Sequence, residues 1–194
     1  MSTEDKIKCL IRVLRDGKLA VIPTDTVYGI VARALDADAV ENLYKAKGRK
    51  PEKPFIILIS SLNQLSDFGV KLSSSNKKII NNLWPGPHTL IFGCDKNLEY
   101  LHRGTEKLAF RLPQNDFLIN LVELTGPLAA PSANPEGFSI SRDIKEATFY
   151  FKEKVDCYFN GGILEGEPST IIDCSNNPPV VLRGNDQILS KLLN

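Results

Sequence analysis

A short polar segment, residues 23–29 (PTDTVYG), follows an apolar run at residues 19–22 that is short enough to be a buried strand. The hydroxyls of Thr24 and Thr26 and the carboxylate of Asp25 are small hydrogen-bonding groups. Because α/β proteins bind ligands beyond the carboxyl ends of their strands, these groups are placed to hold a small polar ligand. The same residue types also form plain turns, and that alternative stays open for the segment taken alone.

The loop at residues 45–53 (KAKGRKPEK) carries five cations in nine positions. Lysines near a helix C-terminus complement the helix dipole without any ligand. Glycine and proline residues order this loop, however, and its charge far exceeds the near-neutral average of the chain. A polyphosphate is the natural counter-charge, since arginine grips phosphate bidentately and lysine meets it as a point charge. The Walker A and Rossmann glycine patterns are both absent.

Two further groups of short polar side chains adjoin apolar strands. Residues 130–134 (APSAN) follow one predicted strand, and residues 167–173 (EPSTIID) lead into another. Arg111 and Arg183 each lie at the end of an apolar run. A strand-end arginine is more often solvated or paired within the protein than bound to a ligand. Two of them beside three hydroxyl-bearing loops favour a binding site.

Composition and charge limit the class of protein. Lys plus Arg number 24 and Asp plus Glu 23, a net charge of +1, which argues against a generic nucleic-acid binder but leaves a local basic patch open. No apolar run approaches the roughly 20 residues of a membrane helix, and the polar N-terminus is not that of a signal peptide. Four scattered cysteines predict ordinary buried thiols, and two histidines leave little for a zinc site or a histidine-based triad. We expect a soluble cytoplasmic protein.

The elements that must position these groups are interleaved helices and strands. Periodicity and capping predict helices from Ser2 or Thr3 to Gly17, from Asp36 or Asp38 to Gly48, at 62–68 and 76–84, from Asn115 to Gly126, and at 143–154 and 186–193. Apolar runs predict strands at residues 19–22, 55–59, 89–92, 107–111, 128–130, 155–159, 170–173 and 180–182. This order predicts a single α/β domain with a mixed sheet.

Six segments, taken in order, resemble the successive motifs of the YrdC/TsaC family. They are residues 23–29, Lys47-Gly48-Arg49 with Lys53-Pro54, 110–113 (FRLP), 131–134 (PSAN), 169–173 (STIID) and 182–184 (LRG). Each motif alone is weak, but the ordered set spans nearly the whole chain and is strong. The resemblance implies one YrdC-like domain over residues 1–194, of the short, single-domain type. Its fold would be a twisted mixed β-sheet flanked by helices, with a concave basic cleft.

The proteins of this family are threonylcarbamoyl-AMP synthases. The resemblance therefore implies a nucleotidyltransferase that converts L-threonine, bicarbonate (or CO2) and ATP into threonylcarbamoyl-AMP and pyrophosphate. The product would pass to the machinery that modifies adenosine 37 of tRNA. Because the amine of threonine attacks the carbon and the resulting carbamate attacks the α-phosphate, the protein need supply no nucleophile. Catalysis would rest on positioning and on charge stabilisation.

The matching motifs also imply roles for individual residues. Charge stabilisation during catalysis would fall to Lys47 and Arg49. The ATP site would comprise Arg49, Lys53, Lys107, Asn134, Arg142 and Arg183, with Lys107 the weakest of the set. The L-threonine site would comprise Thr26, Arg111, Ser132 and Ser169, with Arg111 pairing with the carboxylate. Magnesium would bridge the phosphates of ATP, although no dedicated carboxylate cage is evident.

The sequence departs from the family pattern at several positions, namely Lys50, Leu58, Lys107 and residues 135–137 (PEG). Two alternative functions stay open beside the synthase. The first is an RNA-binding or ribosome-maturation module of the same fold, with weak direct RNA binding. The second is the carbamoyl-adenylate chemistry of hydrogenase maturation factors, whose zinc-finger and acylphosphatase regions this chain has no room to hold.

Overall fold

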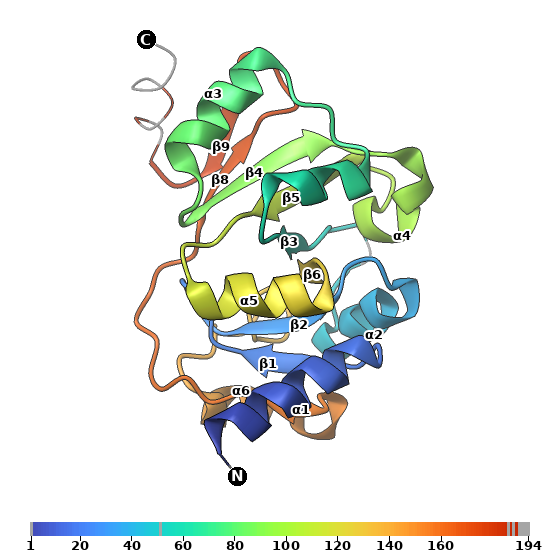
Figure 1. The fold of residues 1–194 in the computed structure, drawn as a ribbon, viewed down its shortest axis with the longest axis vertical. Coiled ribbons are helices and arrows are strands. Elements are labelled where there is room, and N and C mark those ends of the chain that lie inside the picture. The colour runs from blue at the N-terminus through green and yellow to red at the C-terminus, as the bar shows by residue number, and fades with distance from the viewer. Residues whose placement is uncertain (1, 51, 186, 188, 190–194) are drawn as a thin grey trace.

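The computed structural model describes residues 2–50, 52–185, 187 and 189, and nine strands of this part form one twisted sheet (Figure 1). The strand order is β7-β1-β2-β6-β3-β5-β4-β8-β9. The strands are β1 (Ala20–Ile22), β2 (Gly29–Arg33), β3 (Ile56–Leu58), β4 (His88–Gly93), β5 (Lys107–Arg111), β6 (Leu128–Ala129), β7 (Cys157–Tyr158), β8 (Thr170–Asp173) and β9 (Val180–Arg183). The pairs β1/β7, β3/β5 and β4/β8 are parallel, whereas β1/β2, β2/β6, β3/β6, β4/β5 and β8/β9 are antiparallel. The expected mixed sheet is therefore confirmed.

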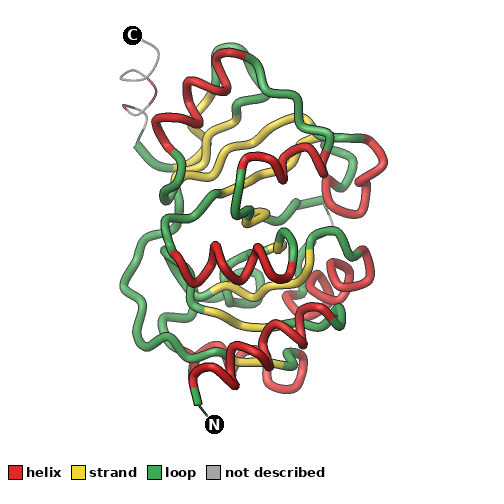
Figure 2. The backbone as a smooth tube through the Cα atoms, viewed as in Figure 1, coloured by secondary structure: helices red, strands yellow, loops and turns green. Residues whose placement is uncertain are grey.

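Helices flank this sheet (Figure 2). The α-helices are α1 (Thr3–Arg15), α2 (Ala37–Lys47), α3 (Ser74–Leu83), α4 (Glu99–His102), α5 (Asp116–Thr125) and α6 (Ile144–Phe151). Short 3-10 helices are η1 (Leu62–Phe68), η2 (Lys96–Leu98) and η3 (Lys152–Lys154). The predicted α/β fold class is correct, since helices and strands alternate through most of the chain.

Alternating side chains of the strands form two apolar cores, one on each face of the sheet. In β1, Ala20 and Ile22 pack into a smaller core with residues of α1 and α5, such as Leu14 and Leu121. Val21 between them packs into the larger core, to which α2 contributes Leu43. Because both faces of the sheet are covered here, the residues of β1 form a continuous apolar run. The polar groups lie where such strands end.

Helix ends follow the predicted capping residues. The Ser2 hydroxyl accepts from the Asp5 backbone N–H, and the Asp5 carboxylate accepts from Ser2 in return, so α1 begins with a capping box. Asp36 and Asn115 cap α2 and α5 through backbone N–H groups, each at 3.0 Å. Gly48 ends α2 with φ of 60°, a left-handed conformation that glycine adopts freely. The basic loop thus begins at a defined helix end.

Some expectations differ from the structure. β2 was not predicted from the sequence, because its buried residues form a short run without alternation after a segment rich in turn formers. β2 pairs antiparallel with β1, opposing Ile30 to Val21, so residues 23–28 connect a hairpin. Residues 96–102, which form η2 and α4, were also unpredicted. The predicted terminal helix at 186–193 lies largely outside the described residues.

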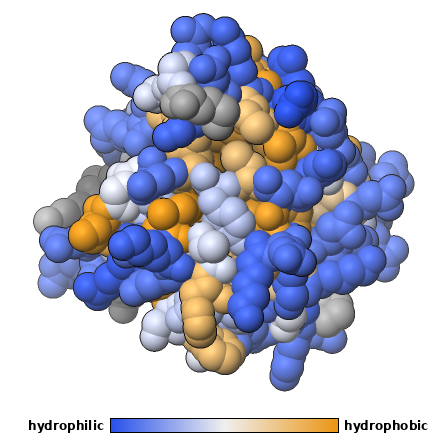
Figure 3. All heavy atoms as spheres, turned by 90° about the horizontal axis from the view of Figure 1, so that it is seen from below, coloured by the Kyte–Doolittle hydropathy of each residue, from blue (hydrophilic) through white to orange (hydrophobic). Residues whose placement is uncertain are grey.

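The cysteines are less buried than the sequence predicted. All four cysteines are free, but only Cys174 is buried, while Cys9, Cys94 and Cys157 are half-buried, so the expectation of four buried thiols was wrong. Among the described helices, none is long and apolar enough to cross a membrane. Seen from below, the surface is hydrophilic around its edge, and apolar residues gather toward the middle of that face (Figure 3).

Lys47, at the end of α2, is a buried cation that ties this helix to the segment after β6. Only 3 % of Lys47 is exposed. Its ammonium donates to the backbone carbonyls of Ser132, at 2.6 Å, and Asn134, at 2.5 Å. Burial lowers the pKa of Lys47 to about 7, and the nearby Arg49 adds to this effect. Lys47 therefore holds two elements of the fold together.

We expect Lys47→Met to lower the free energy of unfolding by about 1–3 kcal/mol, because two half-buried carbonyls lose a charged donor. Urea unfolding followed by circular dichroism measures this difference. Lys45→Met is the matched control, since Lys45 lies in the same last turn and is exposed. Equal stabilities of the two variants would contradict the structural role of Lys47.

Candidate functional site

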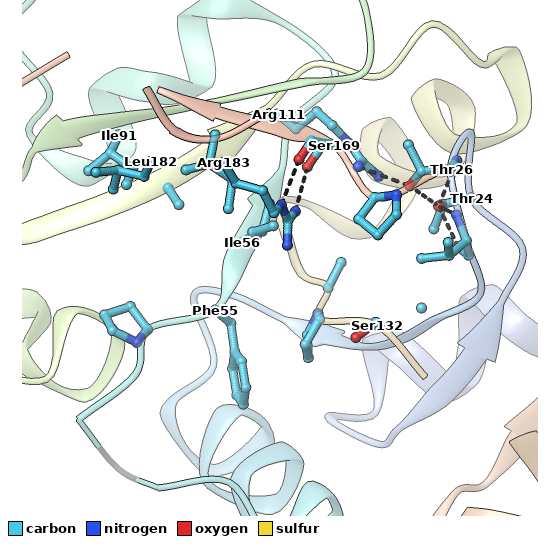
Figure 4. Close-up of a pocket in the computed structure, with 18 of the residues that line it drawn as sticks. Thr24, Thr26, Phe55, Ile56, Ile91, Arg111, Ser132, Ser169, Leu182 and Arg183 are labelled. Carbon is cyan, nitrogen blue, oxygen red and sulfur yellow. Dashed lines mark hydrogen bonds between the residues drawn. The ribbon is translucent and has the colours of Figure 1, made fainter. Parts of the chain in front are cut away.

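A cavity of about 460 Å³ is formed by the 23–29 segment, the loops at 54–56 and 130–132, and strands β4, β5, β8 and β9 (Figure 4). Seven of the predicted site residues line this cavity, namely Thr26, Arg49, Lys107, Arg111, Ser132, Ser169 and Arg183. The other four, Lys47, Lys53, Asn134 and Arg142, are not among its lining residues. The fold thus brings together most of the residues that the motifs selected, from strand ends far apart in the sequence.

The 23–29 segment is shaped by the hydroxyl of Thr24. Its Oγ1 accepts from the backbone N–H groups of Thr26 and Val27, both at 3.2 Å, and donates to the Val27 carbonyl. It also lies 3.0 Å from Oγ1 of Thr26. Thr24 is therefore the residue that closes the turn, while Thr26 presents its hydroxyl beside the cavity (Figure 4).

Arg111, at the end of β5, is a buried cation with two partners on the 23–29 segment. Its Nη1 donates to Thr26 Oγ1 at 3.1 Å, and its Nη2 lies 2.9 Å from Oδ1 of Asp25. The side chains of Arg111 and Asp25 are 6 % and 9 % exposed. Burial lowers the pKa of Arg111, and burial also raises the pKa of the Asp25 carboxyl, which the guanidinium offsets only in part. The pair holds two strand ends together at the cavity wall.

Ser169 and Arg183 form a second polar group, on the side of Arg111 that faces away from Thr26 (Figure 4). The Ser169 hydroxyl lies 2.8 Å from Oγ1 of Thr89 on β4. Arg183, at the end of β9, donates from Nε to the Ser169 carbonyl at 2.9 Å and from Nη2 to its hydroxyl at 3.4 Å (Figure 4). Burial lowers the pKa of Arg183. Hydroxyl and guanidinium donors therefore face the same space as Arg111.

The loop after β6 contributes Ser132 to the cavity and turns Asn134 away from it. The Ser132 hydroxyl donates to Oδ1 of Asn134 at 2.6 Å, and the Asn134 amide donates to the Phe138 carbonyl at 2.7 Å. Asn134 thus fixes the loop. With the Lys47 ammonium engaged by the same loop, neither of these residues presents a free polar group to the cavity.

The basic loop is ordered by contacts within the chain. The Arg49 guanidinium donates to the carbonyls of Lys53, at 3.0 Å, and Pro54, at 3.4 Å, and lies over the Phe55 ring. Glu136 accepts from the Lys53 ammonium at 2.5 Å and from the Lys50 backbone N–H at 2.9 Å. The hydrogen bond from the Lys53 ammonium is the main reason why the pKa of Glu136 is lowered to about 2. The Glu136 carboxylate therefore pairs with Lys53, the lysine that was expected to meet phosphate.

The remaining cations of the predicted ATP site lie farther apart. Lys107 lines the cavity but pairs with Asp173, at 3.2 Å. The Arg142 backbone contacts Glu146 and Leu164, and its side chain lines a different hollow beside α6. The cavity lining holds four cations and one carboxylate, but each cation has a polar partner in the chain, so the predicted basic cleft stays a prediction.

The pairing of Asp25 with Arg111 was not predicted from the sequence, which left Asp25 open as a ligand-binding or a turn residue. Sequence reasoning also missed the loop at 160–168, which lies against the 23–29 segment. Gly161 donates to the Tyr28 hydroxyl at 2.9 Å, and a Cβ at Gly166 would come within 2.0 Å of the Thr26 carbonyl. The three glycines of this loop were a visible signal of close backbone approach. Its partner was not visible, because the contact spans more than 130 residues.

Comparison with known proteins places this fold and cavity in a family. Residues 12–184 match the family model for Sua5, YciO and YrdC, described as telomere recombination. A curated relative from Pyrococcus abyssi, named threonylcarbamoyl-AMP synthase, is 36% identical over 93% of this chain and 54% of its own length. A relative of the same name from Pseudomonas aeruginosa is 31% identical over 89% of this chain and 95% of its own.

Solved structures agree with the sequence comparison. The crystal structure of P. abyssi Sua5 complexed with L-threonine superposes with a TM-score of 0.87 at 35% identity, over 94% of this chain and 55% of that one. The chain thus spans about half the length of the P. abyssi protein. The matched region covers the cavity and every segment that lines it, and this chain belongs to the Sua5/YciO/YrdC family.

Proposed function

We propose that this protein is an L-threonylcarbamoyladenylate synthase, which forms threonylcarbamoyl-AMP and pyrophosphate from L-threonine, bicarbonate or CO2, and ATP. The observation that carries this proposal is the cavity at Arg111, in a fold shared with a Sua5 protein crystallised with L-threonine. A buried guanidinium in a cavity that Thr26, Ser132 and Ser169 also line suits a small hydroxylated amino acid. The lining residues of the cavity, among those described, include no histidine or cysteine.

At the amino-acid end, Arg111 would bind the carboxylate of threonine, and Thr26, Ser132 and Ser169 would surround the rest of the substrate. The threonine amine attacks the carbon of CO2 and releases a proton, or it attacks the carbon of bicarbonate, whose departing hydroxide takes up the amine proton and leaves as water. A carbamate oxygen then attacks the α-phosphorus of ATP, and pyrophosphate leaves. Both nucleophiles belong to the substrates, so these side chains act by orienting them.

At the phosphate end, Arg49 and Arg183 would stabilise the negative charge that develops as the α-phosphate is attacked. Arg49 is the member of the basic loop that reaches the cavity. Lys53 would join it once its ammonium leaves Glu136. The expected ATP roles of Asn134, Arg142 and Lys107, and the catalytic role of Lys47, remain predictions, because Lys47 and Asn134 serve the loop after β6.

Magnesium would supply charge neutralisation on the phosphates of ATP. The described residues contain no group of three His, Cys, Asp or Glu side chains able to hold a metal ion. The one carboxylate in the cavity lining, Asp173, is paired with Lys107. These residues do not form a site for a resident magnesium ion, and we derive no step from one. Any magnesium would be part of the nucleotide substrate.

The wider setting follows from the same proposal. The mixed anhydride of threonylcarbamate and AMP is an activated carbamoyl donor, which suits transfer to adenosine 37 of tRNA by further machinery. A cytoplasmic location and weak direct RNA binding stay predictions from the sequence.

Arg111→Ala is expected to weaken threonine binding by about tenfold or more, because the carboxylate loses a charge-assisted hydrogen bond. Isothermal titration calorimetry of folded protein measures the effect. Arg33→Ala is the control, since Arg33 lies on the sheet away from the cavity and donates to the Arg15 carbonyl. Unchanged threonine affinity in folded Arg111→Ala would contradict the assignment.

Arg49→Ala is expected to abolish threonine-dependent pyrophosphate release from ATP while leaving the fold and threonine binding intact. The physical reason is loss of the cation that reaches the cavity from the basic loop. Lys50→Ala is the matched control, because Lys50 is the exposed neighbour of Arg49. Normal turnover by Arg49→Ala would show that this guanidinium does not meet phosphate.

Glu136→Gln is expected to lower the KM for ATP roughly two- to fivefold, because it removes the carboxylate that competes for the Lys53 ammonium. Steady-state pyrophosphate release at saturating threonine gives this KM. Glu153→Gln, on η3 and outside the cavity lining, controls for the change in net charge. A KM for ATP that stays the same or rises in Glu136→Gln would refute the competition.

A further inference from the structure

The ion pair between Asp25 and Arg111 joins a residue that lines the cavity to one that does not. Arg111 is among the lining residues, whereas Asp25 lies behind it. Both side chains are more than nine-tenths buried, and Arg111 Nη2 lies 2.9 Å from Asp25 Oδ1. Asp25 is therefore placed to influence a ligand in this cavity through the guanidinium.

Apart from Asp25, the guanidinium has a single hydrogen-bond partner among the described residues. Its Nη1 donates to Thr26 Oγ1, and its Nε is buried without a hydrogen-bond partner among the described residues. Burial lowers the pKa of Arg111 and the positive charge of Arg183 adds to this effect, so a second cation also acts on the guanidinium. Asp25 supplies the opposite charge that holds Nη2 in place and offsets this repulsion.

The shape of the 23–29 segment does not explain Asp25. The turn is closed by Thr24, whose Oγ1 bonds the backbone of Thr26 and Val27. A residue needed only for the turn would have no reason to bury a carboxylate, which is costly unless it is paired. The carboxylate is instead directed at Arg111.

We infer that Asp25 is a positioning residue that fixes the Arg111 guanidinium in the orientation that receives the carboxylate of the amino-acid substrate. This inference rests on the proposed function for the identity of that substrate. Asp25 holds Nη2 from behind, and Thr26 holds Nη1 from the side. The second N–H of Nη1 and the second N–H of Nη2 are thereby left for the ligand.

The test is a double-mutant cycle with Asp25→Asn, Arg111→Gln and the variant that carries both. Asparagine keeps the size of Asp25 and removes its charge. Asp25→Ser replaces Asp25→Asn if the latter does not fold. The matched control is Glu41→Gln, which breaks another arginine ion pair, with Arg103 at 2.6 Å, outside the cavity lining. Threonine Kd, the KM values for threonine and ATP, kcat and the melting temperature are measured for each variant.

We expect Asp25→Asn to raise the Kd and KM for threonine about tenfold, with the KM for ATP and kcat at saturating threonine within about twofold of wild type. In the Arg111→Gln background, removing the Asp25 charge should weaken threonine binding no further. Glu41→Gln should leave threonine binding unchanged. Additive effects of the two substitutions, or an unchanged threonine Kd in folded Asp25→Asn, would overturn the inference.

A separate measurement distinguishes failure of this inference from failure of the proposed function. If the wild-type protein does not bind threonine, the proposed function fails and the positioning is tested by crystallography alone. Loss of the 3.1 Å contact between Arg111 Nη1 and Thr26 Oγ1 in Asp25→Asn, with the contact kept in wild type, supports the inference. The same guanidinium orientation in both crystals overturns it.

Discussion

The buried ion pair of Arg111 and Asp25 is the interaction on which the arrangement of the cavity depends. It joins the end of β5 to the hairpin connection between β1 and β2. In the sheet, β6 and β3 lie between β5 on one side and the β1/β2 hairpin on the other. Removing one partner of such a pair typically costs about 3–5 kcal/mol, because the other charge stays buried alone. The pair therefore fixes the distance between two walls of the cavity and supplies its most buried cation.

The basic side chains of the cavity region fall into two groups with different tasks. Arg49, Lys107, Arg111 and Arg183 reach the cavity, whereas Lys47 is engaged by backbone carbonyls and Lys53 by Glu136. A lysine is a flexible point charge, so the same motif residue serves equally as a link between elements or as a ligand. The sequence motif that these cations share does not show which of them links elements and which reaches the cavity. The burial of each side chain and the hydrogen-bond acceptors around it decide this.

The proposed reaction needs no nucleophile from the protein, and the described residues that line the cavity include no histidine or cysteine. A reaction whose nucleophiles belong to the substrates needs donors held in fixed directions, and the cavity supplies guanidinium and hydroxyl groups anchored by hydrogen bonds. Thr26, Ser169 and Arg183 each form a hydrogen bond with another residue of the protein. Such preorganisation lowers the reorganisation required when charge develops.

The sequence by itself determined the alternation of helices and strands, the capping residue Asn115, and the motif segments that meet at the cavity. These depend on local periodicity and on hydrogen bonds between near neighbours. For the first two helices the sequence left two adjacent or near-adjacent caps each, Ser2 or Thr3 and Asp36 or Asp38. It did not reveal β2, whose short buried run has no distinctive period, nor that Asp25 faces Arg111 and that Glu136 holds Lys53. Those pairings join residues more than 80 positions apart, and only the packing of the sheet decides which side chains meet.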